Sequence, residues 1–210
     1  MHKRTIETIA LSLAAAGLLA ACATRLPDAE AERRAQEAYD QAFVKSGRTD
    51  MIARLKQDEV QQLCTRYRGS PPKEIADNIE KSQFSVIRYP AAGSLMGDWK
   101  LGERLAQDGW GLRFTDTDPK RANGGNCYNC HRIGPQELSF GTLGPTLYQY
   151  GKQRGASEAM QRYTYGKIYN AQAFTACSNM PRMGHNRVLT PEQITHLVAL
   201  LLDPASPVNK

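Results

Sequence analysis

An all-α fold is predicted for this chain of 210 residues. Several segments combine helix-forming residues with a capping residue at one end and a helix breaker at the other. In addition, no segment shows the strict alternation of apolar and polar residues that is typical of a half-buried strand. A chain of this length can bury one good core and a small accessory domain.

Residues 1–21 are predicted to be a signal peptide. His-Lys-Arg at 2–4 precedes an apolar run over 9–21. This run is too short to span the hydrocarbon core of a membrane as a helix. The run ends in Leu-Ala-Ala-Cys, which resembles a bacterial lipoprotein cleavage box and makes Cys22 a candidate lipidation site. Ordinary cleavage after the A-x-A pattern of 21–23 is the alternative. Both routes predict a periplasmic protein, and lipidation would anchor it to the envelope membrane.

Residues 22–90 are predicted to form a linker and a helical extension. Strong helix formers with Asp28 as N-cap indicate a first helix over 28–46. Apolar stripes indicate a second helix over 50–64 and a third over 75–89. This region holds no cluster of metal ligands, so we expect it to pack on the following domain or on a partner.

The second domain is predicted over residues 91–210. Asp98 can cap a helix over 99–107, in which Gly102 would allow a close crossing with another helix. A further helix, over 157–168, begins at a serine cap.

The strongest helix signal comes last. Thr-Pro-Glu-Gln at 190–193 supplies a cap, a proline at the first helical position and a capping-box glutamine ahead of an apolar run over 194–202. Such a helix needs a partner to bury it, and the helix over 99–107 is the candidate. His196 is interpreted as an ordinary helix-face side chain and not as a ligand.

The segment Cys127-Tyr-Asn-Cys130-His131 has the Cys-x-x-Cys-His pattern of c-type haem attachment. Cys127 and Cys130 can each add a thiol to a haem vinyl group, and His131 can bind the iron as proximal ligand. A thioredoxin-like dithiol would need a strand-to-helix context, and a zinc site would need a second paired cluster. One covalently bound haem c is therefore predicted.

Gly144-Pro145-Thr-Leu follows the haem motif at the distance where c-type cytochromes place a backbone carbonyl against the haem histidine. We assign this carbonyl to Pro145, where it would fix the orientation of His131. First-against-last helix packing around such a motif is the architecture of class I cytochrome c. The predicted fold is therefore a class I cytochrome c-like domain with an N-terminal helical extension.

A net charge of +6 is a mild basic excess. It is enough to bias docking toward an acidic partner surface and too small to indicate a nucleic-acid partner. No Ser/His/Asp arrangement and no carboxylate pair is tied together by spacing, so no catalytic residue is assigned.

Segments outside the haem motif add a specific resemblance, which covers about residues 60–209. Together with the haem motif, the chain resembles SoxX, the monohaem subunit of the SoxAX cytochrome of bacterial sulfur oxidation. The chain departs from the expected pattern at Met183, where phenylalanine is usual, and before residue 60. The segments that carry the resemblance are Tyr89-Pro90, Gly97-Asp98-Trp99-Lys100, Gly124-Gly125-Asn126-Cys127-Tyr128, Gly144-Pro145-Thr146-Leu147, Tyr150-Gly151-Lys152, 167–174, 177–182 and 201–209.

The resemblance implies a heterodimer with the haem-bearing SoxA subunit. This complex, an L-cysteine S-thiosulfotransferase, oxidatively joins thiosulfate to a cysteine of the SoxYZ carrier protein. The sulfur chemistry takes place on SoxA, and the SoxX haem would relay the released electrons to a downstream cytochrome. A free-standing periplasmic electron-shuttle cytochrome is the alternative function.

Met180 is predicted to be the sixth iron ligand. A methionine directly before proline on an extended loop is how this fold presents its thioether, and Met180 also matches the position implied by the resemblance. Soft thioether ligation would raise the reduction potential relative to ligation by two histidines. His185 is the alternative ligand, and Met183 is interpreted as a residue that packs near the haem edge.

Counting cysteines predicts a disulfide between Cys64 and Cys177. Of five cysteines, two belong to the haem motif, and Cys22 is either lipidated or removed. The remaining two would pair in an oxidising compartment if geometry allows. Two buried free thiols that lie too far apart to bridge are the alternative.

Overall fold

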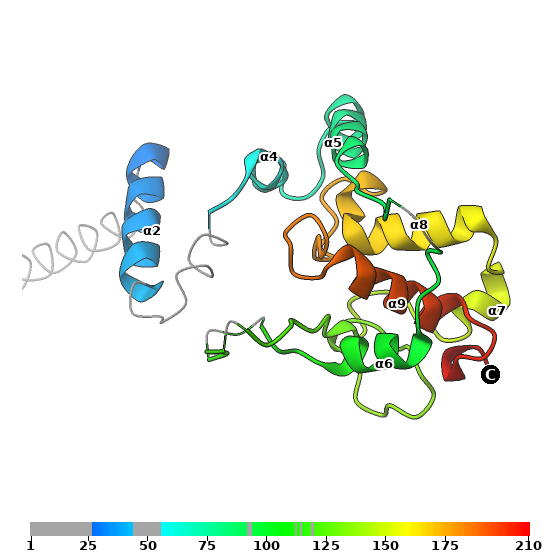
Figure 1. Cartoon of the computed structure of the whole chain (residues 1–210). Coiled ribbons are helices and arrows are strands. Elements are labelled where there is room, and N and C mark those ends of the chain that lie inside the picture. Colours follow the sequence, from blue (N-terminus) through cyan, green and yellow to red (C-terminus); the bar gives the residue numbers. More distant parts are fainter. Residues whose placement is uncertain (1–26, 44–55, 92–93, 112, 114, 119) are drawn as a thin grey trace, which may run out of the picture. The chain divides into compact units, whose positions relative to one another are not determined.

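The computed structural model describes residues 27–43, 56–91, 94–111, 113, 115–118 and 120–210. These residues form helices, turns and loops and contain no strand, which confirms the all-α prediction (Figure 1). The predicted signal peptide and Cys22 lie outside the described residues. No helix among those described is long and apolar enough to cross a membrane.

The chain divides into two compact units, residues 1–46 and 47–210. The described part of the first unit contains α2, Asp28–Phe43, whose side chains are almost all exposed. Glu30 in its first turn pairs with Arg33 at 2.9 Å and with Arg34 at 2.7 Å. The predicted helix is confirmed as far as Phe43, and its expected end at 46 falls outside the described residues.

The second unit begins its described part with α4, Glu59–Arg66. The prediction of one continuous helix over 50–64 is wrong, because residues 56–58 are not helical, and its part over 50–55 lies outside the described residues. Asp58 is the N-cap: its carboxylate accepts a hydrogen bond from the Gln61 N–H at 2.9 Å, and the Gln61 side chain accepts one from the Asp58 N–H at 2.9 Å. This capping box sets the start of the helix.

α5, Lys73–Ser85, follows a pair of prolines. It ends four residues before the expected position, with Val86 as its C-cap, and Tyr89-Pro90 continues in non-helical backbone. A proline disfavours helical conformation in the residue before it, so Tyr89 was an unfavourable end for the predicted helix.

In the part of the second unit that the structure describes after α5, four α-helices and three short 3₁₀ turns follow. α7 was not predicted, because five residues are too few to show a periodic pattern. In chain order the elements are α6 (Trp99–Gln107), η1 (Cys127–Asn129), α7 (Tyr150–Arg154), α8 (Glu158–Tyr169), η2 (Ala171–Ala173), α9 (Pro191–Leu202) and η3 (Pro207–Asn209).

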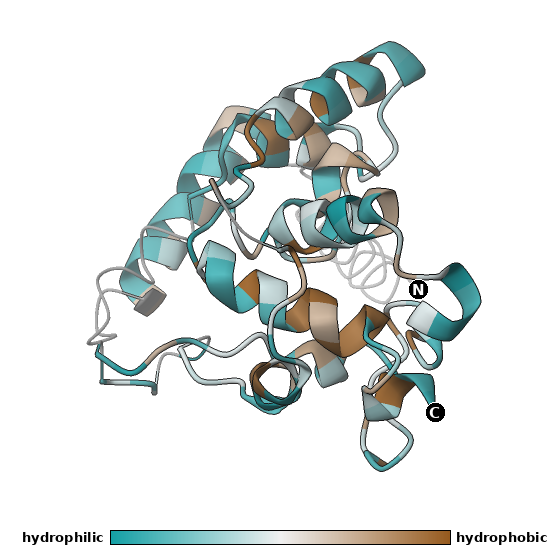
Figure 2. Cartoon of the chain, turned by 45° about the vertical axis from the view of Figure 1, so that its right-hand side comes forward, coloured by the Kyte–Doolittle hydropathy of each residue, from teal (hydrophilic) through white to brown (hydrophobic). Residues whose placement is uncertain are grey.

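α9 is the centre of the core of this unit. All of its residues from Ile194 to Leu202 are buried except His196, and Figure 2 shows hydrophobic residues concentrated along it. The predicted capping box is present, since the Thr190 side chain accepts a hydrogen bond from the Gln193 N–H at 3.2 Å. Burial of this apolar helix supplies a large part of the driving force for folding.

α6 packs closely against α9, as predicted. A Cβ atom added to Gly102 would lie 2.1 Å from the carbonyl oxygen of His196, so any side chain at this position would separate the two helices. His196 adds a polar contact: its Nδ1 accepts a hydrogen bond from the backbone N–H of Asp98 at 2.9 Å. This contact agrees with the interpretation of His196 as a helix-face side chain, and it shows that Asp98 is its partner.

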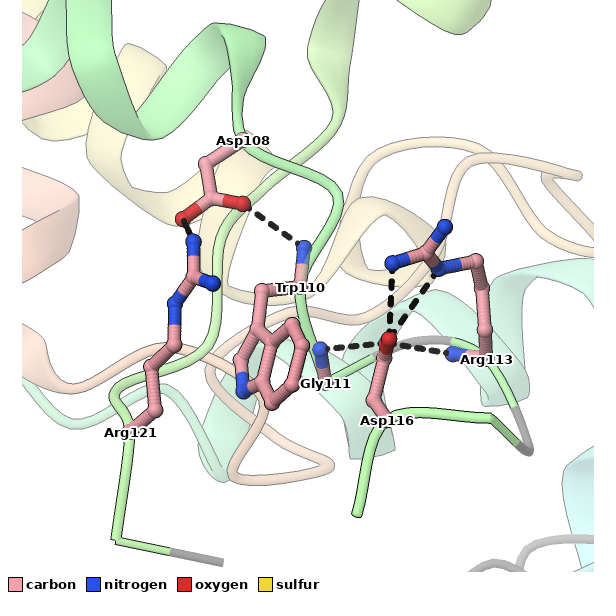
Figure 3. Close-up of polar contacts among 6 residues, drawn as sticks. All are labelled: Asp108, Trp110, Gly111, Arg113, Asp116 and Arg121. Atoms are coloured by element: carbon pink, nitrogen blue, oxygen red, sulfur yellow. Dashed lines mark hydrogen bonds and ion pairs between the residues drawn. The ribbon is translucent and has the colours of Figure 1, made fainter. Parts of the chain in front are cut away.

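The loop between α6 and η1 is organised around two carboxylates (Figure 3). Asp108, the C-cap of α6, accepts a hydrogen bond from the Trp110 N–H at 2.8 Å and pairs with Arg121 at 3.1 Å. The guanidinium of Arg121 in turn lies 4.3 Å from the centroid of the Trp110 ring. The backbone N–H of Asn126 donates to the carbonyl of Asp108 at 2.9 Å, so this loop returns the chain to the end of α6 just before η1.

Asp116 is the second carboxylate, and its side chain is buried. It accepts hydrogen bonds from the Gly111 N–H at 2.8 Å and from the Arg113 guanidinium at 2.8 Å (Figure 3). Burial by itself raises the pKa of Asp116, but Arg113 and the backbone N–H groups outweigh it and hold this pKa below its ordinary value.

We expect Asp116→Asn to lower the free energy of unfolding at neutral pH, because the charge that pairs with Arg113 is lost. A carboxyl group whose pKa is lower in the folded state stabilises the fold fully when the pH is above its unfolded-state pKa of about 4. This stabilisation is lost as the pH falls through its folded-state pKa. The difference in free energy of unfolding between wild type and Asp116→Asn should therefore become smaller below about pH 4. Urea unfolding over a pH series measures it, with the exposed Asp118 changed to Asn as control. A gap that stays constant with pH would contradict this account.

Candidate functional site

The Cys-x-x-Cys-His segment folds into a single turn. The backbone N–H groups of Cys130 and His131 both donate to the carbonyl of Cys127, at 3.1 and 3.0 Å. Asn126 enters the turn in the left-handed conformation, with φ of 50°, which asparagine adopts more readily than most residues. Both cysteines and the histidine are therefore held on one short stretch of backbone.

Tyr128, between the two cysteines, fastens this turn to α6. Its side chain is 6% exposed, and its hydroxyl donates to Glu103 at 2.9 Å and accepts from the N–H of Gly134 at 3.1 Å. Burial and then the Glu103 carboxylate raise the pKa of Tyr128, so the hydroxyl keeps its proton and stays a donor. Sequence reasoning assigned no role to this tyrosine.

His131 is oriented by the backbone of Pro145. Its ring nitrogen Nδ1 lies 2.8 Å from the carbonyl oxygen of Pro145, and because a carbonyl only accepts, Nδ1 carries the hydrogen. Nε2 then has a lone pair available for a metal. A Cβ atom added to Gly144 would lie 2.1 Å from Cε1 of His131, so a residue without a side chain is needed here. This is the contact that the Gly-Pro-x-Leu segment predicts.

The thiols of Cys127 and Cys130 are both free. Burial raises the pKa of the Cys127 thiol to about 12. A thioredoxin-like dithiol needs the opposite, an attacking thiol with a lowered pKa, so this alternative is disfavoured. In the part of the chain that the structure describes, no group of three or more His, Cys, Asp or Glu residues could hold a metal ion.

The two candidate methionines share a loop, residues 177–185, but differ in their surroundings. Met183 is 7% exposed and belongs to the hydrophobic core. Met180 is only partly buried, and it packs against the same core as Cys127 and Leu147. Met183 therefore packs within the core. The Met180 assignment stays a prediction.

His185, the alternative ligand, lies beside an ion pair. Its backbone N–H donates to the carbonyl of Tyr169 at 3.1 Å. Burial and then the positive charge of Arg182 lower the pKa of His185, and the carboxylate of Asp58 opposes this shift. The imidazole is therefore in the electrostatic field of Arg182 and Asp58.

Cys64 and Cys177 form a disulfide, with their Cα atoms 5.4 Å apart. The pairing predicted from the cysteine count is present, and the alternative of two distant free thiols is wrong. The disulfide lines a surface hollow of about 540 Å³ together with Thr65, Arg68, Gly69 and Asn179. It links α4 to the loop that carries Met180.

No family model matches the chain. The chain is 34% identical over 192 residues to a protein of Aquifex aeolicus (strain VF5) that is named an uncharacterized lipoprotein. The match covers 89% of this chain and 85% of that protein.

Proposed function

The chain belongs to the same family as this Aquifex aeolicus lipoprotein, and we propose that it is the monohaem c-type cytochrome subunit of a SoxAX-type complex. One observation carries the haem assignment: Nδ1 of His131 lies 2.8 Å from the carbonyl oxygen of Pro145. His131 itself follows directly on two cysteines whose thiols are free and which lie on the same turn. A metal-binding histidine needs a partner of this kind on its other nitrogen. The crossing of α6 and α9 supports a class I cytochrome c-like domain.

A bound haem c supplies reversible one-electron chemistry at its iron. In this proposal Cys127 and Cys130 would hold it covalently, and His131 and Met180 would bind its iron. Pro145 keeps the imidazole of His131 oriented, and Gly144 leaves room for that ring. The soft thioether of Met180 favours ferrous iron, which suits a group that takes up electrons.

The sulfur-oxidising role rests on the SoxX-like segments. We propose that the partner is a SoxA-type haem subunit, on which thiosulfate is joined oxidatively to a cysteine of the SoxYZ carrier. The present chain would take up the released electrons and pass them to a downstream cytochrome. The complex would act as an L-cysteine S-thiosulfotransferase, with this chain as its electron-transfer subunit.

We further propose a periplasmic location with a lipid anchor at Cys22. The sequence around Cys22 resembles a lipoprotein cleavage box, and the Aquifex aeolicus relative is named a lipoprotein. Mass spectrometry of the mature amino terminus tests this assignment: an acylated Cys22 supports it, and a chain that begins after position 23 contradicts it.

Purification from the native source tests the function. We expect the chain to copurify with a second, haem-bearing subunit, and we expect the complex to show thiosulfate-dependent activity when SoxYZ is added. A monohaem monomer that gains no such activity on addition of a SoxA-type subunit would contradict the proposal. That result would favour the free-standing electron shuttle instead.

An exposed apolar loop next to the haem motif supplies a candidate surface for the partner. Leu138 and Leu143 are 90% and 89% exposed, and Phe140 is 38% exposed. The loop is joined to the haem turn, since the Gly141 N–H donates to the carbonyl of Tyr128 at 2.8 Å. Apolar side chains gathered on a surface in this way mark interaction sites.

We expect Leu138→Asp combined with Leu143→Asp to weaken binding of the haem-bearing partner subunit by about tenfold or more, the effect typical of losing a binding hot spot. Ser139→Asp combined with Thr142→Asp is the matched control, because it adds the same two charges to exposed positions of the same loop without removing apolar surface. Analytical ultracentrifugation of the mixed subunits measures the affinity. Equal weakening by the control and by the leucine variant would contradict an apolar interface here.

A further inference from the structure

Arg182 is a buried cation two residues after the proposed ligand Met180. Its side chain is 5% exposed. A guanidinium stays charged in proteins, and burying it is costly unless it is paired and hydrogen-bonded. The groups that pair with Arg182 therefore determine where this part of the loop can lie.

The ion-pair partner of Arg182 is Asp58, 124 residues earlier in the chain. Asp58 is the N-cap of α4, and its two carboxylate oxygens have separate tasks. Oδ1 accepts the hydrogen bond from the Gln61 N–H at 2.9 Å, and Oδ2 accepts from Nη2 of Arg182. Because Oδ1 is fixed by the start of the helix, Oδ2 presents a rigid acceptor to the loop.

A second partner of Arg182 comes from α5. Nη1 of Arg182 donates to Oε1 of Gln83 at 3.3 Å, and Nδ2 of Asn170 donates to the same oxygen at 3.0 Å. Gln83 is 7% exposed and Asn170 is fully buried. The N-cap of α4 and a side chain of α5 therefore converge on this one guanidinium, and Asn170 at the C-cap of α8 holds the Gln83 side chain in place.

α4 thus holds the loop on both sides of Met180. Three residues before Met180, Cys177 is bonded to Cys64 in α4. Two residues after it, Arg182 pairs with Asp58 at the start of the same helix. We propose that Arg182 is a positioning residue, which through Asp58 keeps the Met180 thioether at the haem iron. The inference rests on the proposed function, since it takes covalent haem and Met180 ligation as its premises.

The test uses the purified holoprotein with Arg182→Gln. The sulfur-to-iron charge-transfer band at the red end of the oxidised spectrum reports Met180 ligation, and Met180→Ala gives the reference for its complete loss. Imidazole is the second probe, because it binds ferric iron only when the methionine has left. We expect Arg182→Gln to weaken the band and to speed imidazole binding by about tenfold, as the loss of one charge-assisted hydrogen bond would allow.

Three further variants separate positioning from general stability. Arg182→Lys keeps the charge and should restore part of the wild-type behaviour. Asp58→Asn keeps a good helix cap but removes the charge that faces Arg182, and should reproduce the effects of Arg182→Gln. Lys73→Ala breaks the exposed ion pair with Asp77 in α5, at 2.6 Å, and should bind imidazole like wild type.

The inference is overturned if Arg182→Gln and Asp58→Asn keep the full band and the wild-type rate of imidazole binding, even where their thermal midpoints fall. If Arg182→Gln does not fold, Asp58→Asn decides alone by the same criteria. A wild-type chain without covalent haem would instead overturn the proposed function. Covalent haem without the charge-transfer band would overturn the Met180 assignment and this inference but leave the attachment site standing.

Discussion

Replacing Cys127 and Cys130 together by alanine is expected to abolish covalent haem in the mature protein. Each thiol contributes one thioether bond, so without both the cofactor can be held only by its axial ligands and by apolar contacts. The turn itself should persist, because its hydrogen bonds are between backbone groups and Tyr128 still anchors it to α6. Intact-mass analysis after denaturation measures the loss, since a covalently bound haem stays with the chain.

The single variants and a disulfide variant make this result specific. Cys127→Ala and Cys130→Ala should each keep at most one thioether, which shifts the absorption bands of the reduced haem from those of wild type. Cys64→Ser combined with Cys177→Ser removes the other pair of cysteines and should leave the haem covalently attached. Wild-type protein whose mass lacks haem, or a double variant of Cys127 and Cys130 that retains it, would contradict the assignment.

Helices were predictable from the sequence where their signals are local. α6 and α9 begin at the predicted caps, Asp98 and Thr190, because a cap acts on N–H groups within three residues. Their pairing could also be expected, since an apolar run like that of α9 must be covered and Gly102 offers a place for close approach.

The start of α4 was missed although its signal is local. The Asp58 and Gln61 pair has capping-box spacing, but the apolar stripe that begins upstream of this pair predicts an earlier start. The apolar stripe and the capping box therefore predict different starts for this helix, and α4 begins where the capping box predicts.

Contacts between distant segments account for the rest of what sequence reasoning did not find. Asp58 and Arg182 are 124 residues apart, and Glu103 and Tyr128 are separated by the loop after α6. A charged or polar residue with a distant partner looks in the sequence like any solvated side chain. The disulfide was an exception, because counting cysteines limits the pairings even without geometry.

Removing the disulfide by Cys64→Ser together with Cys177→Ser is expected to lower the free energy of unfolding of the holoprotein by roughly 5 kcal/mol in the chain-entropy model. The reason is that the bond closes a loop spanning 113 positions, and such a crosslink removes many conformations from the unfolded chain. Urea unfolding of the two proteins measures the difference. A dithiol reductant should bring wild type to the stability of the variant and leave the variant unchanged.

Besides this global effect, a local one at Met180 is expected. Cys177 lies three residues before Met180, so without the bond to Cys64 this side of the loop loses its tie to α4, while Arg182 still holds the other side. Imidazole should then bind the ferric iron of Cys64→Ser/Cys177→Ser faster than that of wild type, and adding Arg182→Gln should speed it further. Two freely alkylated thiols in the unreduced, denatured wild-type protein would show that the bridge is absent. Equal rates of imidazole binding in wild type and in Cys64→Ser/Cys177→Ser would show that the disulfide stabilises the fold without holding Met180 at the iron.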